Sequence, residues 1–217
     1  MSLRKTSFAS GEYYHIYNRG NSKQTIFHDQ EDYLRFLKLL FLANGEKSFK
    51  IYFIKENPYE FEKGKNLVDI GAYCLMPNHF HLLITQTEEG DISKFMQKIS
   101  TGYSMYYNNK YKRTGTLFEG KFKAEHIDND RYLKYIFSYI HLNPVKIIDS
   151  KWKENGIKNT NKTLTFLEKY NFSSYQDFCG KDREQNKILS TNSFPNYFPS
   201  KDSFKREIFD WLTYKDK

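Results

Sequence analysis

The 217-residue chain is poor in cysteine and proline, and it contains no long apolar segment. Its two cysteines, Cys74 and Cys179, lie far apart and form no Cys-x-x-Cys pair, which argues against a disulfide framework and a zinc knuckle. No apolar run approaches the roughly 20 residues that span a bilayer, and Met1–Gly11 lacks the apolar core of a signal peptide. These absences predict a cytoplasmic protein without a membrane partner.

The signatures of two zinc enzyme classes are also absent. The chain has no His-Glu-x-x-His sequence, and it lacks the His-x-Glu and Pro-Cys-x-x-Cys pair of the zinc deaminases. No internal repeat is evident. A zinc hydrolase or deaminase is therefore disfavoured.

What the chain does have is positive charge and aromatic side chains. Lysine and arginine number 34 against 26 acidic residues, a formal charge of +8, and aromatic residues make up 18% of the chain. A basic surplus gives salt-sensitive affinity for phosphates, and aromatic rings can stack on bases. The alternative for any single ring is a place in the core. The composition favours a nucleic-acid partner.

The most informative segment is the one from Tyr73 to Ile84, where two histidines flank one bulky apolar residue. Side chains alternate between the faces of a β-strand, so His79 and His81 share a face, about 6–7 Å apart, while Phe80 points to the core. Two imidazoles on one face of a rigid sheet supply half of a divalent-metal site. Two strand histidines without a ligand are an equally good interpretation of this segment alone.

A second segment, residues 131–146, combines a helical period with a tyrosine and an asparagine one turn apart. Apolar and aromatic residues recur there at steps of three and four, which gathers them on one helical face. Asp128 or Asn129 can cap the helix start, and Pro144 favours fraying of the last turn around Asn143. Tyr139 and Asn143 can approach the same point, although a tyrosine stripe by itself is more typical of core packing.

Together the two segments resemble the HUH endonucleases that use a single tyrosine, and most closely the insertion-sequence and REP-associated tyrosine transposases. Four stretches carry this resemblance, in the family's order: His15-Ile-Tyr-Asn-Arg-Gly20, Met76-Pro-Asn-His-Phe-His-Leu-Leu83, Arg113-Thr-Gly-Thr-Leu-Phe-Glu-Gly-Lys-Phe-Lys123 and Tyr139-Ile-His-Leu-Asn-Pro-Val-Lys146. Residues 171–180 also resemble the segment after the family's core. The connection formed by residues 45–66 is longer than is usual in the family, and it could form either an extra hairpin or a loop that contacts DNA. Residues after 181 match nothing in the family.

The resemblance implies a role for each matching residue. It makes His79 and His81 metal ligands, places Asn143 where a polar side chain completes the metal site, and makes Tyr139 the nucleophile. A divalent metal, Mg²⁺ or Mn²⁺, then activates the scissile phosphate for attack by the tyrosine. The expected products are a 5′-phosphotyrosine and a free 3′ hydroxyl. Because the ester conserves the bond energy, the strands can later be rejoined.

The sequence allows alternatives for the proton acceptor, the metal, the oligomeric state and the nucleophile. The tyrosine proton can go to Glu125 or His126. Zinc could occupy the metal site in a preparation, and monomer and homodimer both occur in the family. Four other tyrosines compete with Tyr139 as nucleophile: Tyr103, Tyr106, Tyr107 and Tyr135.

The resemblance implies that the partner is single-stranded or hairpin DNA. The best candidates for phosphate contacts lie in two of the four stretches: Arg19, Arg113, Lys121 and Lys123. The last two alternate with Phe122 in the manner of a strand.

The predicted order of elements indicates an α+β fold. Strands are expected over residues 13–18, 67–75, 80–87 and 116–126, a further short strand over 50–55, and helices over 29–44, 91–111 and 131–143. The order β-α-β-β-α-β predicts a ferredoxin-like, RRM-like sandwich, an antiparallel sheet with helices on one face and the histidine strand at its centre.

Two parts are expected along the chain. Residues 1–150 form the catalytic domain, and residues 151–217 form a largely irregular C-terminal extension. In the extension we expect a loop over residues 151–162, a short helix after Thr163, and an amphipathic helix over residues 201–214. Docking of that last helix on the core is the expected outcome, with a second subunit or DNA as the alternatives.

The predicted function is a DNA transposase that cuts and joins single strands. The main alternative is a non-catalytic module that binds single-stranded nucleic acid on an RRM-like sheet and makes no use of Tyr139. A domesticated enzyme that acts on chromosomal repeats has the same residues, and only the DNA flanking the gene separates it from a mobile transposase.

Overall fold

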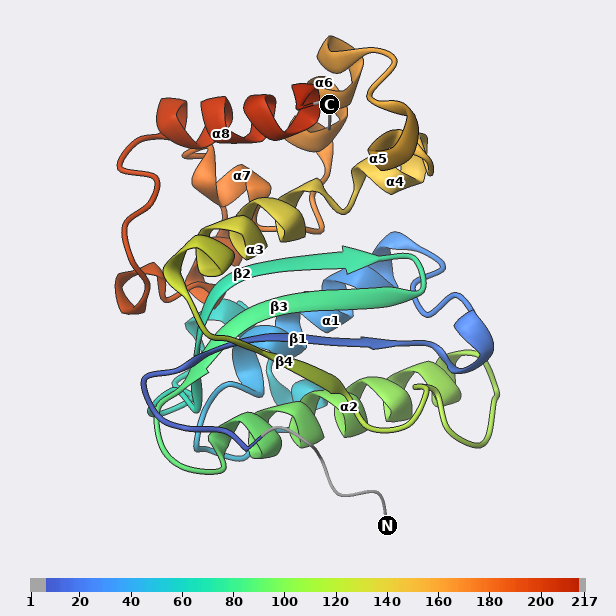
Figure 1. The fold of residues 1–217 in the computed structure, drawn as a ribbon. Helices are drawn as coiled ribbons and strands as arrows, with labels where there is room; N and C mark the ends of the chain where they lie inside the picture. The colour runs from blue at the N-terminus through green and yellow to red at the C-terminus, as the bar shows by residue number, and fades with distance from the viewer. Residues whose placement is uncertain (1–6, 215–217) are drawn as a thin grey trace.

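The computed structural model describes residues 7–214 and is built on a four-stranded antiparallel sheet (Figure 1). The strands are β1 (Tyr13–Arg19), β2 (Val68–Met76), β3 (His79–Gln86) and β4 (Lys123–Ile127). Their order across the sheet is β2-β3-β1-β4, and the connecting helices are α1 (Gln30–Leu42) and α2 (Asp91–Lys110). The β-α-β-β-α-β order and the central place of β3 confirm the predicted fold class.

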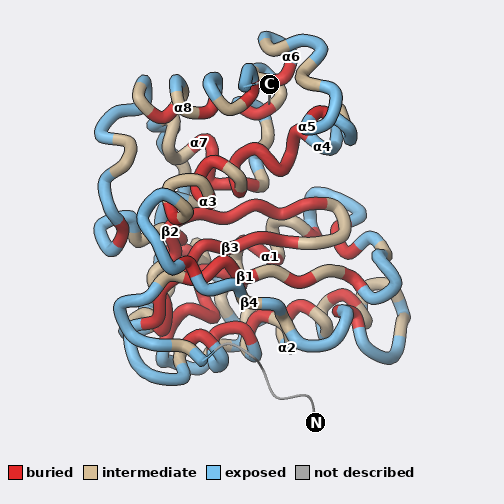
Figure 2. The backbone as a smooth tube through the Cα atoms, in the orientation of Figure 1, coloured by how far each residue is buried: buried red, intermediate tan, exposed pale blue. Residues whose placement is uncertain are grey.

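A third long helix, α3 (Asp130–Leu142), adds a layer to the expected sandwich. Phe80, Leu82 and Ile84 of β3 pack with α1 and α2 on one face of the sheet, whereas Leu83 packs with α3 on the other. The apolar stripe of α3 needs a partner surface, and small or apolar side chains of β2 and β3 supply it. With both faces covered, β2 and β3 are buried along most of their length, while the edge strand β4 is largely exposed (Figure 2).

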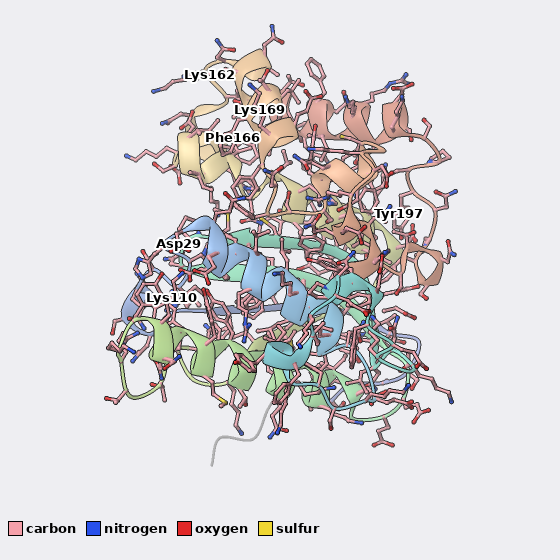
Figure 3. The ribbon with its side chains drawn as sticks, turned by 180° about the vertical axis from the view of Figure 1, so that it is seen from behind. Asp29, Lys110, Lys162, Phe166, Lys169 and Tyr197 are labelled. Carbon is pink, nitrogen blue, oxygen red and sulfur yellow. The ribbon has the colours of Figure 1, made fainter. Side chains whose placement is uncertain are left out.

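The C-terminal region packs helices onto α3. These are α4 (Val145–Ile148), α5 (Trp152–Asn155), α6 (Thr160–Lys169), α7 (Tyr175–Phe178) and α8 (Lys201–Thr213). The apolar face of α8, which includes Phe204, Ile208 and Leu212, is buried in one cluster with Leu142, so the expected docking of this helix is confirmed. On α6, Lys162 and Lys169 are exposed (Figure 3).

Short 3-10 turns complete the fold: Asn21–Lys23, Ile51–Phe53, Pro58–Glu60, Glu184–Ile188 and Thr191–Ser193. Within residues 7–214, no helix combines the length and the apolar character that crossing a membrane requires.

The strand predicted over residues 50–55 is wrong. These residues form a 3-10 turn in which Tyr52 and Phe53 are exposed, because no strand of the sheet lies beside them. Backbone hydrogen bonds from Glu46 to Lys65 (3.2 Å) and from Lys47 to Lys63 (3.1 Å) close the base of the long connection. The connection is a closed loop with two short turns.

Other predicted boundaries are also wrong, and the loop expected over residues 151–162 contains helix α5 and the start of α6. The last strand begins at Lys123 and not at Thr116, because the preceding residues make only an isolated bridge and Gly120 has a φ of 68°. The helix expected after Thr163 starts at Thr160, where the Asn159 side chain caps it by accepting a hydrogen bond from the Lys162 amide (2.9 Å).

The buried carboxylate of Asp32 ties α1 to α2 through Lys110. The Lys110 ammonium donates to Asp29 and Asp32 at 2.9 Å, and Asp32 is fully buried (Figure 3 labels Asp29 and Lys110). Burial raises the pKa of Asp32, but hydrogen bonds from Lys110, the Tyr111 hydroxyl and neighbouring donors outweigh this, so its net pKa is lowered. The stability that the carboxylate contributes is therefore present at neutral pH and lost as the pH falls through the lowered pKa.

We expect Lys110→Met to lower the free energy of unfolding by about 2 kcal/mol at pH 7, since a buried charge loses a partner. The difference from the wild type should narrow as the pH falls towards 3, and urea unfolding at several pH values measures it. Lys47→Met, which breaks the exposed ion pair with Glu62, is the control and should cost less than about 0.5 kcal/mol. Equal costs for the two variants would contradict the assignment.

Candidate active site

Helix α3 places Tyr139 over the histidine face of the sheet. Its buried stripe, which includes Ile136 and Ile140, faces β2 and β3, so Tyr139 lies half-buried at the edge of that contact. The Tyr139 ring meets the His81 ring and the His15 ring edge-on, with centroid distances of 5.7 Å in both cases. A phenol and two imidazoles therefore share one small region.

The two histidines of β3 lie on the same face, as the strand period requires. Their ring centroids are 5.0 Å apart. Burial lowers the pKa of His79 to about 4, with smaller effects from the nearby charges of Lys146 and Arg19. Burial also lowers the pKa of His81 well below its usual value, helped by the neighbouring histidines and Lys146. Both rings are thus neutral at pH 7, which is the form that binds metals.

Asn78 fixes which nitrogen of His79 is free. The Asn78 amide nitrogen donates to the Lys23 carbonyl (3.2 Å), so its amide oxygen is left to accept from His79 Nδ1 (2.6 Å). A proton on Nδ1 leaves the lone pair on Nε2. His79 is therefore held in the tautomer whose Nε2 can bind a cation.

Asn143 does not lie on a frayed turn, so that expectation is wrong. Its backbone is helical (φ −54°, ψ −40°), and Pro144 continues directly into α4. The Asn143 amide nitrogen donates to the Tyr139 carbonyl (2.9 Å), whereas its Oδ1 is buried without a hydrogen-bond partner. An orphaned buried oxygen costs free energy unless something binds it.

The side chains present fit a divalent cation. Imidazole–metal bonds are about 2.1 Å long, so rings 5.0 Å apart can reach one ion, and the buried Oδ1 of Asn143, one turn after Tyr139, is an oxygen donor without a hydrogen-bond partner. Within residues 7–214, no three His, Cys, Asp or Glu side chains are grouped to hold a metal. A cation held by two histidines and one amide would keep several positions open for substrate oxygens.

His15 is the residue of this region that the sequence reasoning missed. It lies on β1, is 4% exposed, and its Nε2 is 2.9 Å from His81 Nδ1. The alternation of Tyr13, His15 and Tyr17 on one strand face was a usable signal. This alternation could not place His15 beside His81 from the sequence alone, because the pairing of Tyr17 with His81 depends on the register of two strands.

Neither proton acceptor suggested by the sequence is hydrogen-bonded to Tyr139 among the contacts of the described chain. Glu125 accepts from the Tyr17 hydroxyl (2.8 Å), and His126 is bonded to Glu12 (2.6 Å). Burial raises the pKa of Tyr139, and the Asn143 side chain partly offsets this increase.

The competing tyrosines are placed differently. Three of them lie on α2, on the opposite face of the sheet, and donate their hydroxyls to groups there: Tyr103 to Ile26, Tyr106 to Asp32 and Tyr107 to Thr25. Tyr135 lies one turn before Tyr139 on α3, with the ring centroids 5.9 Å apart.

The predicted basic residues come from β1, from β4 and from the loop between α2 and β4. Arg19 pairs in register with His79, and its guanidinium binds Glu119 (Nη2–Oε1 2.9 Å). Lys123 is exposed on β4, and Lys121 is exposed in the preceding loop. Arg113 lies over the Tyr107 ring, with its Cζ 5.5 Å from the centroid, at the end of α2.

Two lysines that were not among the predicted basic residues lie close to Tyr139 or to the histidines. Lys153 on α5 has its Nζ 4.6 Å from the centroid of the Tyr139 ring. Lys146 is exposed on α4 and acts on the pKa of both His79 and His81. Lys146 and Lys153 lie on α4 and α5, the two short helices that follow α3 in the chain.

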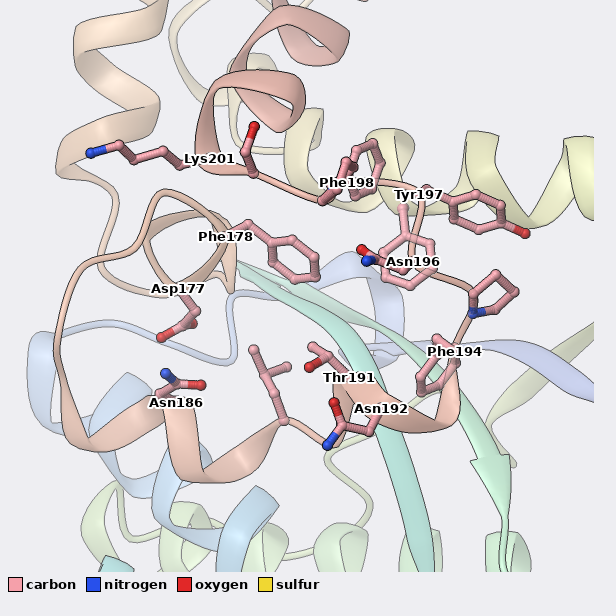
Figure 4. A pocket seen from close by; sticks show the side chains of 15 residues that line it. Asp177, Phe178, Asn186, Thr191, Asn192, Phe194, Asn196, Tyr197, Phe198 and Lys201 are labelled. Carbon is pink, nitrogen blue, oxygen red and sulfur yellow. The ribbon is translucent and has the colours of Figure 1, made fainter.

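Helix α3 borders several cavities of the described chain. One, of about 590 Å³, lies among α7, the last 3-10 turns and the segment before α8, and its labelled side chains include Phe178, Phe194 and Phe198 (Figure 4). None of the predicted site residues lines it. Another, of about 510 Å³, is bordered by Tyr139 together with Trp152 and Trp211. Tyr139 therefore contacts the histidines and also borders an open pocket.

Comparisons with known proteins identify the family. The family model described as "Transposase IS200 like" matches residues 9–143, more than half of the chain. Among solved structures, "Structure of the REP associates tyrosine transposase bound to a REP hairpin" is similar over 83% of this chain and 87% of that one, with a TM-score of 0.53 and 16% sequence identity. At this identity the similarity shows a shared fold. No curated protein sequence matches the chain.

The matched range includes the whole sheet, α1, α2 and α3. An IS200-like transposase is an enzyme that acts on the DNA of mobile elements, in keeping with the basic composition of this chain. The chain belongs to the IS200-like transposase family.

Proposed function

We propose that this transposase cuts and joins single-stranded DNA by using Tyr139 as a covalent nucleophile beside a divalent cation held by His79, His81 and Asn143. The observation that carries the proposal is the position of the Tyr139 ring, 5.7 Å from the neutral imidazole of His81, whose own ring lies 5.0 Å from that of His79. The His15 ring lies at the same distance from Tyr139, so a phenol and two imidazoles meet at one place on the sheet.

Each side chain has a defined task in this proposal. His79 and His81 present neutral nitrogens, and Asn143 offers its unpaired oxygen. When bound, Mg²⁺ or Mn²⁺ supplies Lewis-acid stabilisation to the non-bridging oxygens of the scissile phosphate and positions it. Lys153, 4.6 Å from the Tyr139 ring centroid, favours the negative phenolate as the proton leaves.

The proposed reaction conserves one phosphodiester bond. The Tyr139 hydroxyl loses its proton as its oxygen bonds to phosphorus, the bond from phosphorus to the 3′ oxygen breaks, and the 3′ oxygen takes up a proton to become a free hydroxyl, so one proton is lost and one is gained. The 5′ end of the cut strand is then esterified to the enzyme. The 3′ hydroxyl of a second strand then attacks the phosphorus of the phosphotyrosine. The bond to the Tyr139 oxygen breaks, that oxygen takes up a proton, and the two strands are joined.

We propose single-stranded or hairpin DNA as the partner, since the solved structure with the same fold is described as bound to a hairpin. Arg19, Lys121 and Lys123 remain candidates for phosphate contacts, and Arg113 is a weaker one because of its contact with Tyr107.

We also keep residues 1–150 as the proposed catalytic domain, with residues 151–217 as an extension. Tyr139 lies over histidines of its own chain, so a homodimer is not required to assemble the site.

A covalent-complex assay tests the proposal. Labelled single-stranded DNA containing hairpins from the flanks of the gene is incubated with the protein and Mg²⁺ or Mn²⁺, then separated on a denaturing gel. We expect a shifted protein–DNA band that requires the metal. Tight binding without any covalent band over a broad substrate set would favour the binding-only module.

Lys146→Gln tests whether the charge next to the histidines contacts the DNA backbone. We expect weaker binding to all sequences and a decrease of about 1 in the slope of log affinity against log salt. A filter-binding titration at several salt concentrations measures both. Lys162→Gln, on the exposed face of α6, is the control and should leave the slope unchanged. Identical slopes for the wild type and Lys146→Gln would exclude the contact.

A further inference from the structure

We propose that His15 and Glu125 form a support that holds the His81 imidazole in the tautomer and orientation in which Nε2 faces the cation, an inference that rests on the proposed function. His15 acts through His81 and is a positioning residue. It comes from β1, the strand next to β3, and is almost completely buried.

The contact between the two histidines allows only two arrangements of the proton. His15 Nε2 and His81 Nδ1 are 2.9 Å apart, and the ring planes are 19° from parallel with centroids 5.0 Å apart, so the two rings meet edge to edge in nearly one plane. One of these two nitrogens must carry the hydrogen and the other must accept it. If His81 Nδ1 donates, the lone pair of His81 is on Nε2, where it can bind a metal.

Glu125 decides between the two arrangements. Its Oε2 lies 3.6 Å from His15 Nδ1, an ionic contact slightly too long for a direct hydrogen bond. The Tyr17 hydroxyl donates to the other carboxylate oxygen at 2.8 Å and holds the carboxylate in place. A carboxylate favours a proton on the nearer nitrogen, so His15 carries its hydrogen on Nδ1 and accepts at Nε2. The reverse arrangement directs the lone pair of a neutral His15 at a negative charge.

The support of His81 parallels that of His79. In both cases Nδ1 faces a polar group of the protein, Asn78 for His79 and His15 for His81, which leaves Nε2 for the cation. Partners of this kind fix the orientation of ligand histidines in metal sites and raise their basicity. Here His15 lies between the proposed metal ligand His81 and the carboxylate of Glu125.

The tautomer of His81 tests the inference without metal, DNA or activity. A long-range ¹⁵N–¹H spectrum of the imidazoles in the metal-free protein distinguishes a proton on Nδ1 from one on Nε2. We expect His81 to carry its proton on Nδ1. A proton on Nε2 would overturn the inference.

Substitutions at His15 add a second readout, the affinity of the DNA-free protein for Mn²⁺ measured by the electron paramagnetic resonance of the free ion. His15→Phe keeps a ring against Tyr139 but cannot accept the hydrogen bond, so we expect the affinity to fall by about 10- to 100-fold. His15→Gln can accept from His81 and donate to Glu125, and it should recover most of the loss. His28→Phe removes a histidine that contacts Tyr107 on the opposite face, and it should change nothing.

Unchanged Mn²⁺ affinity in a folded His15→Phe protein would overturn the inference, as would equal losses in His15→Phe and His15→Gln, which indicate packing alone. A wild-type protein that binds no Mn²⁺ contradicts the proposed function, and the tautomer of His81 then decides the inference by itself.

Discussion

Tyr139→Phe is expected to abolish the covalent protein–DNA complex and to lower strand cleavage by about 10⁴-fold or more, because removal of a covalent nucleophile leaves only background catalysis. The variant keeps the ring that packs against His15 and His81, so the fold and the affinity for single-stranded DNA should change little. Denaturing gels measure the covalent band, and binding titrations without metal measure the affinity.

Tyr135→Phe is the matched control for this prediction. It removes the hydroxyl of a half-buried tyrosine one turn away on the same helix, and we expect normal cleavage. A covalent band that persists in Tyr139→Phe and disappears in Tyr135→Phe would identify Tyr135 as the nucleophile. Loss of DNA binding in Tyr139→Phe would instead indicate that the hydroxyl has a structural role.

The segments whose pattern is local could be predicted from the sequence. The period of two in β3 placed His79 and His81 on one face, and the period of three to four in α3 placed Tyr139 on a helix. The capping residues of these elements are also local, so Asn129 was a correct candidate for the start of α3. Local patterns therefore gave the elements that carry most of the proposed site.

What the sequence could not predict depends on contacts between distant segments. The position of α3 on the second face follows from the fit of its apolar stripe to β2 and β3, and His15 reaches His81 through the register of two strands. Lys153 approaches Tyr139 only because the chain turns back after α3. These contacts join residues far apart in the chain, so no local sequence pattern predicts them.

The wrong strand at residues 50–55 has a related cause. Its apolar and aromatic residues match the pattern of a strand, but a strand needs a neighbour, and the structure leaves Tyr52 and Phe53 exposed. Pattern alone does not distinguish a buried strand from an exposed aromatic turn. The same ambiguity affected the tyrosines: their helical pattern does not separate Tyr139 from Tyr103 and Tyr107, whereas the family resemblance and the position over His81 do.

His81→Ala is expected to remove metal-dependent cleavage while leaving the DNA-binding surface intact. A bound cation contributes several kcal/mol to transition-state stabilisation, so loss of a central ligand should lower the rate by about 10³-fold. Removal of divalent cations from the wild type by a chelator should produce a similar loss, because both changes act on the same site. Mn²⁺ affinity and cleavage of a labelled strand, measured in parallel, test the two statements.

His28→Ala is the control for this substitution, since it removes another imidazole from the opposite face of the sheet. It should keep both the Mn²⁺ affinity and the cleavage rate. If His81→Ala cleaves DNA at the wild-type rate in Mg²⁺, His79 and His81 would be structural, and the phosphate would have to be activated by the cationic side chains of Lys146 and Lys153. If His81→Ala loses cleavage but retains Mn²⁺ affinity, the cation binds elsewhere, and the unpaired oxygen of Asn143 would no longer indicate a ligand position.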